Sequence, residues 1–344
     1  MGKRVIITGS RGIAAGLARA LNQRNYEIYL LGGEEADSAS LAKECSNIVG
    51  FNSIDLRNES QVESAFAQAI TKLNGLDHVV SIVGGSGRSF GDGGIEEITK
   101  SAWDKTLELN LTTAFLTARE AIKYFNANGP GSLTLTSSTL ANSPSPEHFR
   151  THAYAASKGA INTLVVTLAS SYLDKKIRVN AVSPSLVATP MSARAAENPI
   201  IKEFTSRKQP LIGEQLPIDN IVAGYIYLIE NSAVTGQILE IEQGQNYLLS
   251  FEASTGEGAT RKMIAGIGLN EDPWTSSKQK VNLTDQIQTF TIILTSAAFG
   301  SQNSRVLFDM GEEVGFVVLD NVSLEVKENL LINGDFQTGR TSWN

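Results

Sequence analysis

The chain has 344 residues, of which 42% are hydrophobic and 19% charged, an ordinary composition for a folded protein with room for two domains. The formal net charge of −7 argues against nucleic acid or an anionic membrane as the partner. No apolar run is long enough to span a bilayer. The start of the chain leads straight into the apolar run of residues 5–7, so we expect no signal peptide. The one cysteine, Cys45, cannot form an internal disulfide, and we expect a cytoplasmic protein.

Up to about residue 246, short apolar runs alternate with amphipathic stretches. The apolar runs predict strands over residues 5–8, 27–31, 48–52, 78–83, 132–136, 178–182 and 237–241. The amphipathic stretches predict helices, among them residues 14–22, 61–73, 101–125 and 154–173. This alternation predicts an α/β fold, a Rossmann-like doubly wound parallel sheet with helices on both faces. Such sheets bind ligands beyond the carboxyl ends of their strands.

After Gly244 the pattern changes to strand, turn and strand. Partial period-two alternation, broken by Gly, Asn and Asp, predicts strands over residues 248–253, 262–268, 279–283, 289–295, 305–310 and 316–326. Many short strands without helices between them suggest a smaller all-β, sandwich-like segment. We therefore predict two domains, residues 1–246 and 247–344.

A glycine-rich turn follows the first predicted strand and leads into the first helix. It consists of Gly9-Ser10-Arg11-Gly12-Ile13-Ala14-Ala15-Gly16. Such a turn lets the backbone approach a pyrophosphate, and the helix N-terminus supplies amide donors and a positive dipole. A glycine turn alone is a weak signal, but its position between strand and helix predicts a dinucleotide site.

Tyr154 and Lys158 lie four residues apart on a predicted helix, which places both side chains on one face. A tyrosine with a pKa of about 10 exchanges protons poorly at neutral pH. A nearby ammonium favours the phenolate, so we expect Lys158 to lower the pKa of Tyr154. The same spacing recurs at Tyr172 and Lys176, which we interpret as a helix terminus. Only Tyr154 lies at a suitable spacing after a predicted strand that ends in paired serines, Ser137 and Ser138.

The glycine turn, the Tyr-x-x-x-Lys spacing and the paired serines together resemble the short-chain dehydrogenase/reductase family. The resemblance implies an NAD(P)-dependent oxidoreductase that interconverts a carbonyl and an alcohol of a small molecule, with Tyr154 as general acid/base. It implies that Ser138, or Ser137 if the register differs by one, polarises the substrate oxygen. It also implies that Asn110 holds a water that relays protons to Lys158.

The resemblance also assigns the dinucleotide contacts. The implied contact residues are Gly9, Ser10, Arg11, Gly12, Ile13, Asp55, Leu56, Gly84, Asn110, Tyr154, Lys158, Pro184, Val187 and Thr189. The second strand ends near Gly32 and lacks the acid that typically binds the ribose of NAD. Arg11 resembles the basic residue that holds the extra phosphate of NADP, although Glu34 and Glu35 would repel it. We expect NADP or NAD, with a slight preference for NADP.

The chain departs from the family pattern in two places. Two residues rather than three separate Gly9 from Gly12, with Ala15 in the place of the last glycine. The sequence Ser-Ile-Val-Gly at 81–84 replaces the family's Asn-Asn-Ala-Gly, so the usual brace of the sheet must be substituted. These departures leave open an alternative, a catalytically idle nucleotide fold that serves carbohydrate binding or scaffolding.

Residues 191–216 show little clear periodicity and predict a substrate lid. The interval between Ser138 and Tyr154 is longer than the family's usual one, and its extra length should line the substrate side. Three histidines, His78, His148 and His152, lack metal-ligand spacing. We interpret them as surface or loop residues, although His148 and His152 could touch substrate. The family's last strand often ends at an oligomer interface, so we expect a homo-oligomer, a dimer or tetramer.

Residues 247–327 resemble the later strands of jelly-roll carbohydrate-binding modules that accompany bacterial polysaccharide hydrolases. The residues that carry the resemblance are 249–253, 272–275, 289–291, 305–311 and 319–324. Residues 329–343 resemble the opening of such a module, yet they come last. The segment is consistent with a permuted and abbreviated module, a truncated tandem array or an artificial fusion.

This second resemblance implies a carbohydrate ligand and a structural calcium ion. Trp274 would stack on a sugar or pack in the core. Asp320 would bind the calcium, with Asp335 as a partner if the module is permuted.

Overall fold

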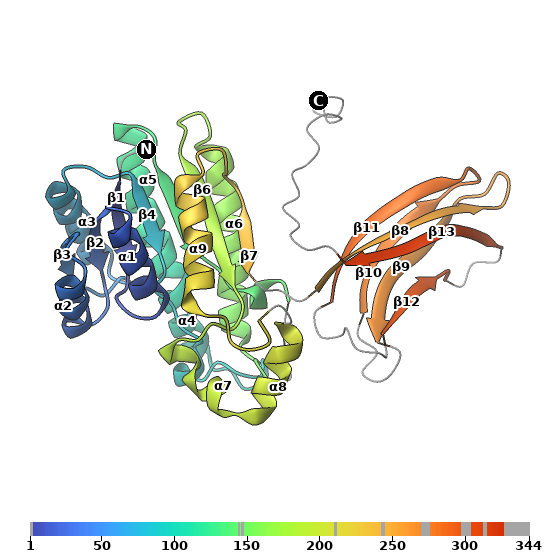
Figure 1. Cartoon of the computed structure of the whole chain (residues 1–344), viewed down its shortest axis with the longest axis horizontal. Coiled ribbons are helices and arrows are strands. Elements are labelled where there is room, and N and C mark those ends of the chain that lie inside the picture. The colour runs from blue at the N-terminus through green and yellow to red at the C-terminus, as the bar shows by residue number, and fades with distance from the viewer. Residues whose placement is uncertain are drawn as a thin grey trace. The chain divides into compact units, whose positions relative to one another are not determined.

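The computed structural model describes residues 3–143, 145, 148–209, 212–241, 245–269, 276–296, 304–311 and 315–326. The chain divides into two compact units, Met1–Glu242 and Gln243–Asn344 (Figure 1). Among the described residues, no helix combines the length and the apolar character needed to cross a bilayer.

The first unit contains a seven-stranded parallel sheet with the strand order β3-β2-β1-β4-β5-β6-β7. The strands are β1 Arg4–Thr8, β2 Glu27–Leu31, β3 Ile48–Asn52, β4 His78–Ser81, β5 Ser132–Thr136, β6 Arg178–Pro184 and β7 Ile238–Ile241. The strand order reverses between β1 and β4, and doubly wound sheets bind ligands at such a reversal. The predicted Rossmann-like sheet is confirmed.

Helices cover both faces of this sheet (Figure 1). They are α1 Ile13–Gln23, α2 Glu35–Glu44, α3 Glu59–Leu73, α4 Lys100–Leu107, α5 Thr113–Asn128, α6 His152–Ser171, α7 Ala193–Glu197, α8 Pro199–Lys208 and α9 Ile218–Glu230. One apolar core joins the sheet to α3, α5 and α6, and a second joins it to α1, α2 and α9. The two cores hold the carboxyl ends of the strands in fixed positions.

The helix predicted over residues 101–125 is confirmed, with one irregularity inside it. A π-helical turn, Glu108–Thr112, separates α4 from α5. The Asn110 side chain lies in this turn and donates from Nδ2 to the carbonyl oxygen of Thr106 at 2.9 Å. Turns of this kind occur frequently at functional sites, and in this one the Asn110 side chain hydrogen-bonds the backbone of Gly85, which follows β4.

The segment predicted as a lid without periodic structure is more regular than expected. It contains a short 3-10 turn, Pro190–Ser192, followed by α7 and α8. The Asn198 side chain accepts hydrogen bonds from the amides of Ile200 and Ile201, and Pro199 occupies the first position of α8. Asparagine followed by proline is a helix start signal, so the sequence did carry the information for α8.

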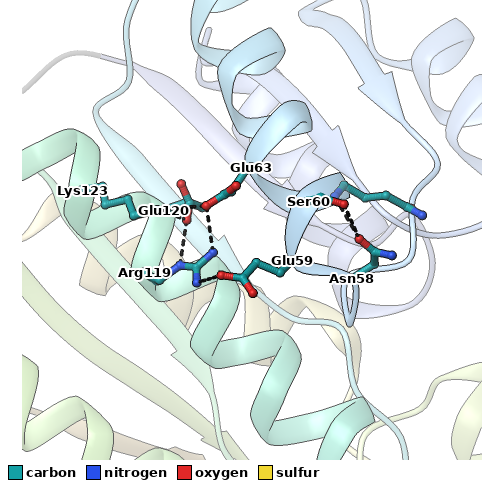
Figure 2. A network of polar contacts seen from close by, with 8 residues as sticks. Asn58, Glu59, Ser60, Glu63, Arg119, Glu120 and Lys123 are labelled. Carbon is teal, nitrogen blue, oxygen red and sulfur yellow. Dashed lines mark hydrogen bonds and ion pairs between the residues drawn. The ribbon is translucent and has the colours of Figure 1, made fainter.

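A polar network joins α3 to α5 on the surface of the first unit (Figure 2). Arg119 contacts the carboxylates of Glu59, Glu63 and Glu120, and Lys123 contacts those of Glu63 and Glu120. Exposed ion pairs contribute about 0–1 kcal/mol each. The network therefore supplements the apolar packing between α3 and α5 without replacing it.

The second unit contains two three-stranded antiparallel sheets, with the orders β10-β9-β12 and β11-β8-β13. The strands are β8 Gln245–Thr255, β9 Arg261–Leu269, β10 Ser276–Leu283, β11 Gln288–Ser296, β12 Ser304–Asp309 and β13 Val317–Val326. Side chains from both sheets form one apolar core, in which Phe251 stacks on Phe290 with ring centroids 5.2 Å apart. The predicted all-β segment is confirmed for the part of this unit that the structure describes.

The carbohydrate and calcium interpretations of this unit stay predictions. Asp320 is exposed, and its carboxylate accepts a hydrogen bond from the amide of Asn321 at 2.8 Å. Across the described residues, no group of three or more His, Cys, Asp or Glu side chains is arranged to hold a metal ion. Trp274, Asp335 and the module-like segment at 329–343 lie outside the described residues.

Candidate active site

A cavity of about 550 Å³ lies at the carboxyl ends of the parallel strands. Its lining comes from the segments that follow β1, β2, β4, β5 and β6, and from the region of α7 and α8. The volume lies in the usual range for small-molecule sites. The position is the one that the strand order predicts.

The glycine turn forms one end of this cavity. Gly9 and Gly12 have φ angles of +93° and +52°. A Cβ on Gly9 would lie 3.3 Å from Cγ2 of Val83, and one on Gly12 would lie 3.3 Å from Cγ2 of Thr189. No side chain caps the N-terminus of α1 within the described residues. The turn therefore leaves backbone and amide donors accessible to a phosphate.

The close approach between helices occurs at Gly16, one residue beyond the Ala15 to which the family pattern assigned the last glycine. A Cβ on Gly16 would lie 2.4 Å from Cγ2 of Ile218 in α9. Glycine is thus required where α1 packs on α9. Ala15 is itself buried and fits with its own methyl group.

Thr8 holds the backbone after β4, where the sequence at 81–84 lacks the two asparagines of the family pattern. Its hydroxyl accepts hydrogen bonds from the amides of Ile82 at 2.8 Å and Val83 at 3.1 Å. Asn110 holds the next segment, because its Oδ1 accepts from the amide of Gly85 at 3.0 Å and its Nδ2 donates to the Gly85 carbonyl at 2.9 Å. Both side chains are fully buried, so the end of β4 is fixed from two sides.

Tyr154, Lys158 and Ser138 come together in the cavity. Lys158 Nζ lies 5.5 Å from the centre of the Tyr154 ring and donates to the carbonyl oxygen of Thr136 at 2.8 Å. The hydroxyl of Ser138 hydrogen-bonds with the Tyr154 side chain. Ser137 instead donates to the backbone carbonyl of Lys158 at 3.2 Å. Of the paired serines, Ser138 is therefore the one beside Tyr154.

The proton affinities differ from the sequence expectation. Burial raises the pKa of Tyr154, and the hydrogen bond from Ser138 opposes this only in part. Burial also lowers the pKa of Lys158 to about 8. The expectation that Lys158 lowers the pKa of Tyr154 is wrong, because burial removes water from both groups and disfavours both charged forms.

Asn110 lies behind the cavity wall. A Cβ on Gly84 would lie 2.6 Å from Oδ1 of Asn110 and 3.3 Å from Nζ of Lys158. Gly84 therefore lets the end of β4 approach both side chains. The second Tyr-x-x-x-Lys pair is elsewhere, since Tyr172 ends α6 and packs against the apolar core.

Asp92 is a site residue that sequence reasoning missed. Its carboxylate accepts hydrogen bonds from the amides of Ala153 at 3.1 Å and Tyr154 at 2.9 Å, and its side chain is buried. The neighbouring Gly93 contributes its carbonyl oxygen to a 2.7 Å contact with Nδ1 of His152. The only signal in the sequence is a Gly-Asp-Gly turn, which by itself predicts a loop.

Most of the expected dinucleotide contacts line the cavity. They are Gly9, Ser10, Arg11, Gly12, Ile13, Gly84, Tyr154, Lys158, Pro184, Val187 and Thr189. Asp55 instead forms an ion pair with Arg57 at 2.8 Å, outside the cavity lining, and Leu56 is buried beside Gly32.

The residue expected to favour NADP is already paired. Arg11 forms an ion pair with Asp37, a residue of α2 that also lines the cavity. Glu34 lines the same end. This end of the cavity therefore carries one arginine and two carboxylates.

Comparisons with known proteins agree with this fold. A family model described as enoyl-(acyl carrier protein) reductase matches residues 7–246. The 3beta-hydroxysteroid dehydrogenase 1 of Eggerthella lenta is 30% identical over 264 residues, which cover 74% of this chain and 98% of that protein. The glucose 1-dehydrogenase of Gluconobacter oxydans is 28% identical over 261 residues, which cover 73% of this chain and 94% of that protein.

Solved structures share the fold. A short-chain type dehydrogenase/reductase from Mycobacterium ulcerans has a TM-score of 0.65 and 23% identity, over 70% of this chain and 89% of that one. The structure of ElxO with NADP bound has a TM-score of 0.63 and 23% identity, over 70% of this chain and 97% of that one.

A doubly wound sheet with a glycine turn at its strand reversal defines a class of dinucleotide-fold proteins. The matches place this chain among the oxidoreductases of that class. The chain belongs to the short-chain dehydrogenase/reductase family.

Proposed function

We propose that the first unit interconverts a carbonyl and an alcohol of a small molecule with NADP or NAD, and that Tyr154 is its general acid/base. The observation that carries this proposal is the grouping of Ser138, Tyr154 and Lys158 in one cavity with the glycine turn. The turn fits a dinucleotide, because Gly9 and Gly12 adopt the positive φ angles of a tight turn and, among the described residues, no side chain caps the amides at the start of α1. When bound, the nicotinamide supplies or accepts the hydride.

The protein's own residues donate and accept the proton. With its pKa raised by burial, Tyr154 is protonated at neutral pH and can donate to a substrate carbonyl oxygen. Ser138 supplies a second hydroxyl beside it, which can stabilise charge on that oxygen. Lys158 lies behind the Tyr154 ring, and Asn110 holds the adjoining backbone. These two residues complete the proposed proton relay.

The Arg11–Asp37 ion pair governs the choice between NADP and NAD. Arg11 is the group that would attract the extra phosphate of NADP, whereas Asp37 and Glu34 repel it. Replacing Asp37→Asn frees the guanidinium and removes one negative charge. We expect the ratio of NADP affinity to NAD affinity to rise about tenfold, measured by calorimetry. An unchanged ratio would remove this pair from cofactor selection.

The principal test uses the two tyrosines as a matched pair. Purified full-length protein is titrated with NADP and NAD by calorimetry, then assayed for oxidation of NADPH and NADH with a panel of ketones and aldehydes. Tyr154→Phe should abolish turnover and retain dinucleotide binding, whereas Tyr172→Phe should retain both. Full activity in Tyr154→Phe on every substrate found would contradict the proposal. Binding of a glucan but of neither dinucleotide would favour a catalytically idle, carbohydrate-binding protein.

A further inference from the structure

The end of the cavity beyond Tyr154 has an apolar wall. Phe149, from the segment before α6, and Phe204, from α8, have ring centroids 6.1 Å apart, and both line the cavity. Leu140 and Ala195 extend the apolar lining. This wall suits a hydrocarbon or aromatic body next to the reacting carbonyl.

The same end carries three cationic side chains, Arg88, Arg194 and Lys208. Lys208 is only 6% exposed, and its Nζ donates to the carbonyl oxygen and hydroxyl of Ser143 at 3.2 and 2.9 Å. Arg88 donates from Nη2 to the carbonyl oxygen of His148 at 3.0 Å. Burial, followed by the charge of Arg194, lowers the pKa of Arg88, so these two cations lie close enough to repel each other.

Lys208 has no carboxylate partner among the described residues, because Ser143 offers its Nζ only neutral acceptors. Arg88 and Arg194 likewise form no ion pair in the described part of the chain. The described carboxylates in the lining, Glu34 and Asp37, lie beside the glycine turn. Asp92 attracts Arg88, but its two oxygens already accept the amides at the start of α6. A buried ammonium without a counter-ion is costly.

A second observation also points to a ligand at this end. Ser145 lines the cavity and is only 4% exposed. Its hydroxyl oxygen has no hydrogen-bond partner among the described residues. Buried hydroxyls are nearly always paired. An anion at this end would accept from both Lys208 and Ser145.

Building on the proposed function, we infer that the substrate is an anionic ketone or alcohol. Its carboxylate or phosphate group binds to Lys208 and Ser145 in the field of Arg88 and Arg194. Its apolar body lies against Phe149 and Phe204, and its carbonyl faces Tyr154. Burial lowers the pKa of Lys208 to about 8, and an anion would stabilise its protonated form.

The test compares ketones that differ in charge. The full-length protein is assayed with 4-acetylbenzoate against its methyl ester, with 5-oxohexanoate against its methyl ester, and with dihydroxyacetone phosphate against dihydroxyacetone. The first two pairs report a carboxylate site and the third a phosphate site. Binding of each compound to the protein–dinucleotide complex is measured by calorimetry, so that a slow substrate still gives a result. We expect the anionic member of at least one pair to bind and react about tenfold better than its neutral partner.

The variant Lys208→Met should remove this preference. It should weaken the binding of the anionic compound and leave the binding of its neutral partner unchanged. The matched control is Lys202→Met, an exposed lysine on the same helix, which should retain it. Equal or better binding of every neutral partner would overturn the inference and leave the proposed function standing. A loss of dinucleotide affinity in Lys208→Met as large as the loss of anion affinity would also overturn it, because the lysine would then serve the cofactor. Failure of the wild type to bind either dinucleotide would overturn the proposed function and this inference together.

Discussion

Asp92 holds the backbone of Tyr154, with its carboxylate 2.9 Å from the Tyr154 amide nitrogen. The same carboxylate accepts from the amide of Ala153, so it caps the N-terminus of α6 from a loop that follows a different strand. A carboxylate is well suited to this position, because helix N-termini carry a partial positive charge. The first turn of α6 is thereby tied to the loop on the substrate side of the cavity. Asp92 is thus a positioning residue for Tyr154.

Replacing Asp92→Ala should lower kcat about tenfold or more, because a small displacement of an oriented catalytic group is costly. Loss of the cap should also lower the free energy of unfolding by about 1 kcal/mol. The measurements are steady-state kinetics, dinucleotide calorimetry and urea unfolding. Asp92→Asn keeps one acceptor and should recover part of kcat.

The matched control for Asp92 is Asn58→Ala. Asn58, labelled in Figure 2, caps α3 by accepting from the amide of Gln61 at 3.1 Å. It is not among the residues that line the cavity. This variant should lose similar stability and keep its kcat. If Asp92→Ala loses stability and nothing else, Asp92 only stabilises the helix.

Thr8 and Thr134 provide a second matched pair. Thr8→Val leaves two partly buried amides without an acceptor and should cost about 1–3 kcal/mol of unfolding free energy. The Thr134 hydroxyl has no partner among the described residues, so Thr134→Val should change stability by less than about 0.5 kcal/mol or raise it. Urea unfolding of both variants checks this. Equal losses in the two variants would show that β-strand packing, not the hydroxyl, is responsible.

Sequence patterns predicted the strands of the sheet well because each buried parallel strand is a short apolar run between glycine and polar breaks. They also predicted that Tyr154 and Lys158 would face the same way, since this follows from helix geometry alone. Asp92 and Thr8 could not be found in this manner. Their roles depend on which backbone amides the fold brings to their oxygens, and that is a contact between distant segments.

The sequence did not predict the direction of the pKa shift of Tyr154, for a related reason. The spacing of Tyr154 and Lys158 indicates proximity, but the direction of a pKa shift depends on how much water remains around both groups. Burial is decided by the elements that enclose the site, including α7 and α8, whose pattern was weak in the sequence. The same enclosure makes Lys208 and Ser145 informative, and neither stands out in the sequence.

Alanine substitutions at Gly16 and Gly159 distinguish a glycine that close helix packing requires from a glycine that only lowers helix stability. Gly16→Ala places a methyl group 2.4 Å from Ile218 and should cost about 1–3 kcal/mol, because the core must shift. A Cβ on Gly159 in α6 would meet nothing within 4 Å, so Gly159→Ala should stabilise by about 0.5–1 kcal/mol. Adding Ile218→Ala to Gly16→Ala should relieve the clash and recover part of the loss. Thermal unfolding of the three proteins measures this, and a neutral Gly16→Ala would mean that α1 and α9 are not closely packed.

The two buried lysines should make the first unit more stable as the pH rises above neutral. Lys158 and Lys208 each have a pKa of about 8 in the folded protein, lowered by burial from the ordinary value of 10.5. Between these two values the unfolded chain keeps protons that the folded chain has released, so the free energy of unfolding increases with pH. From pH 7 to pH 9 the gain should be about 1 kcal/mol for each lysine.

All described helices lie in the first unit, so urea unfolding followed by helical circular dichroism reports on it. Lys158→Met and Lys208→Met should each remove their share of the gain, whereas Lys202→Met should leave it intact. A pH dependence that survives in the double variant Lys158→Met/Lys208→Met would show that other groups cause it.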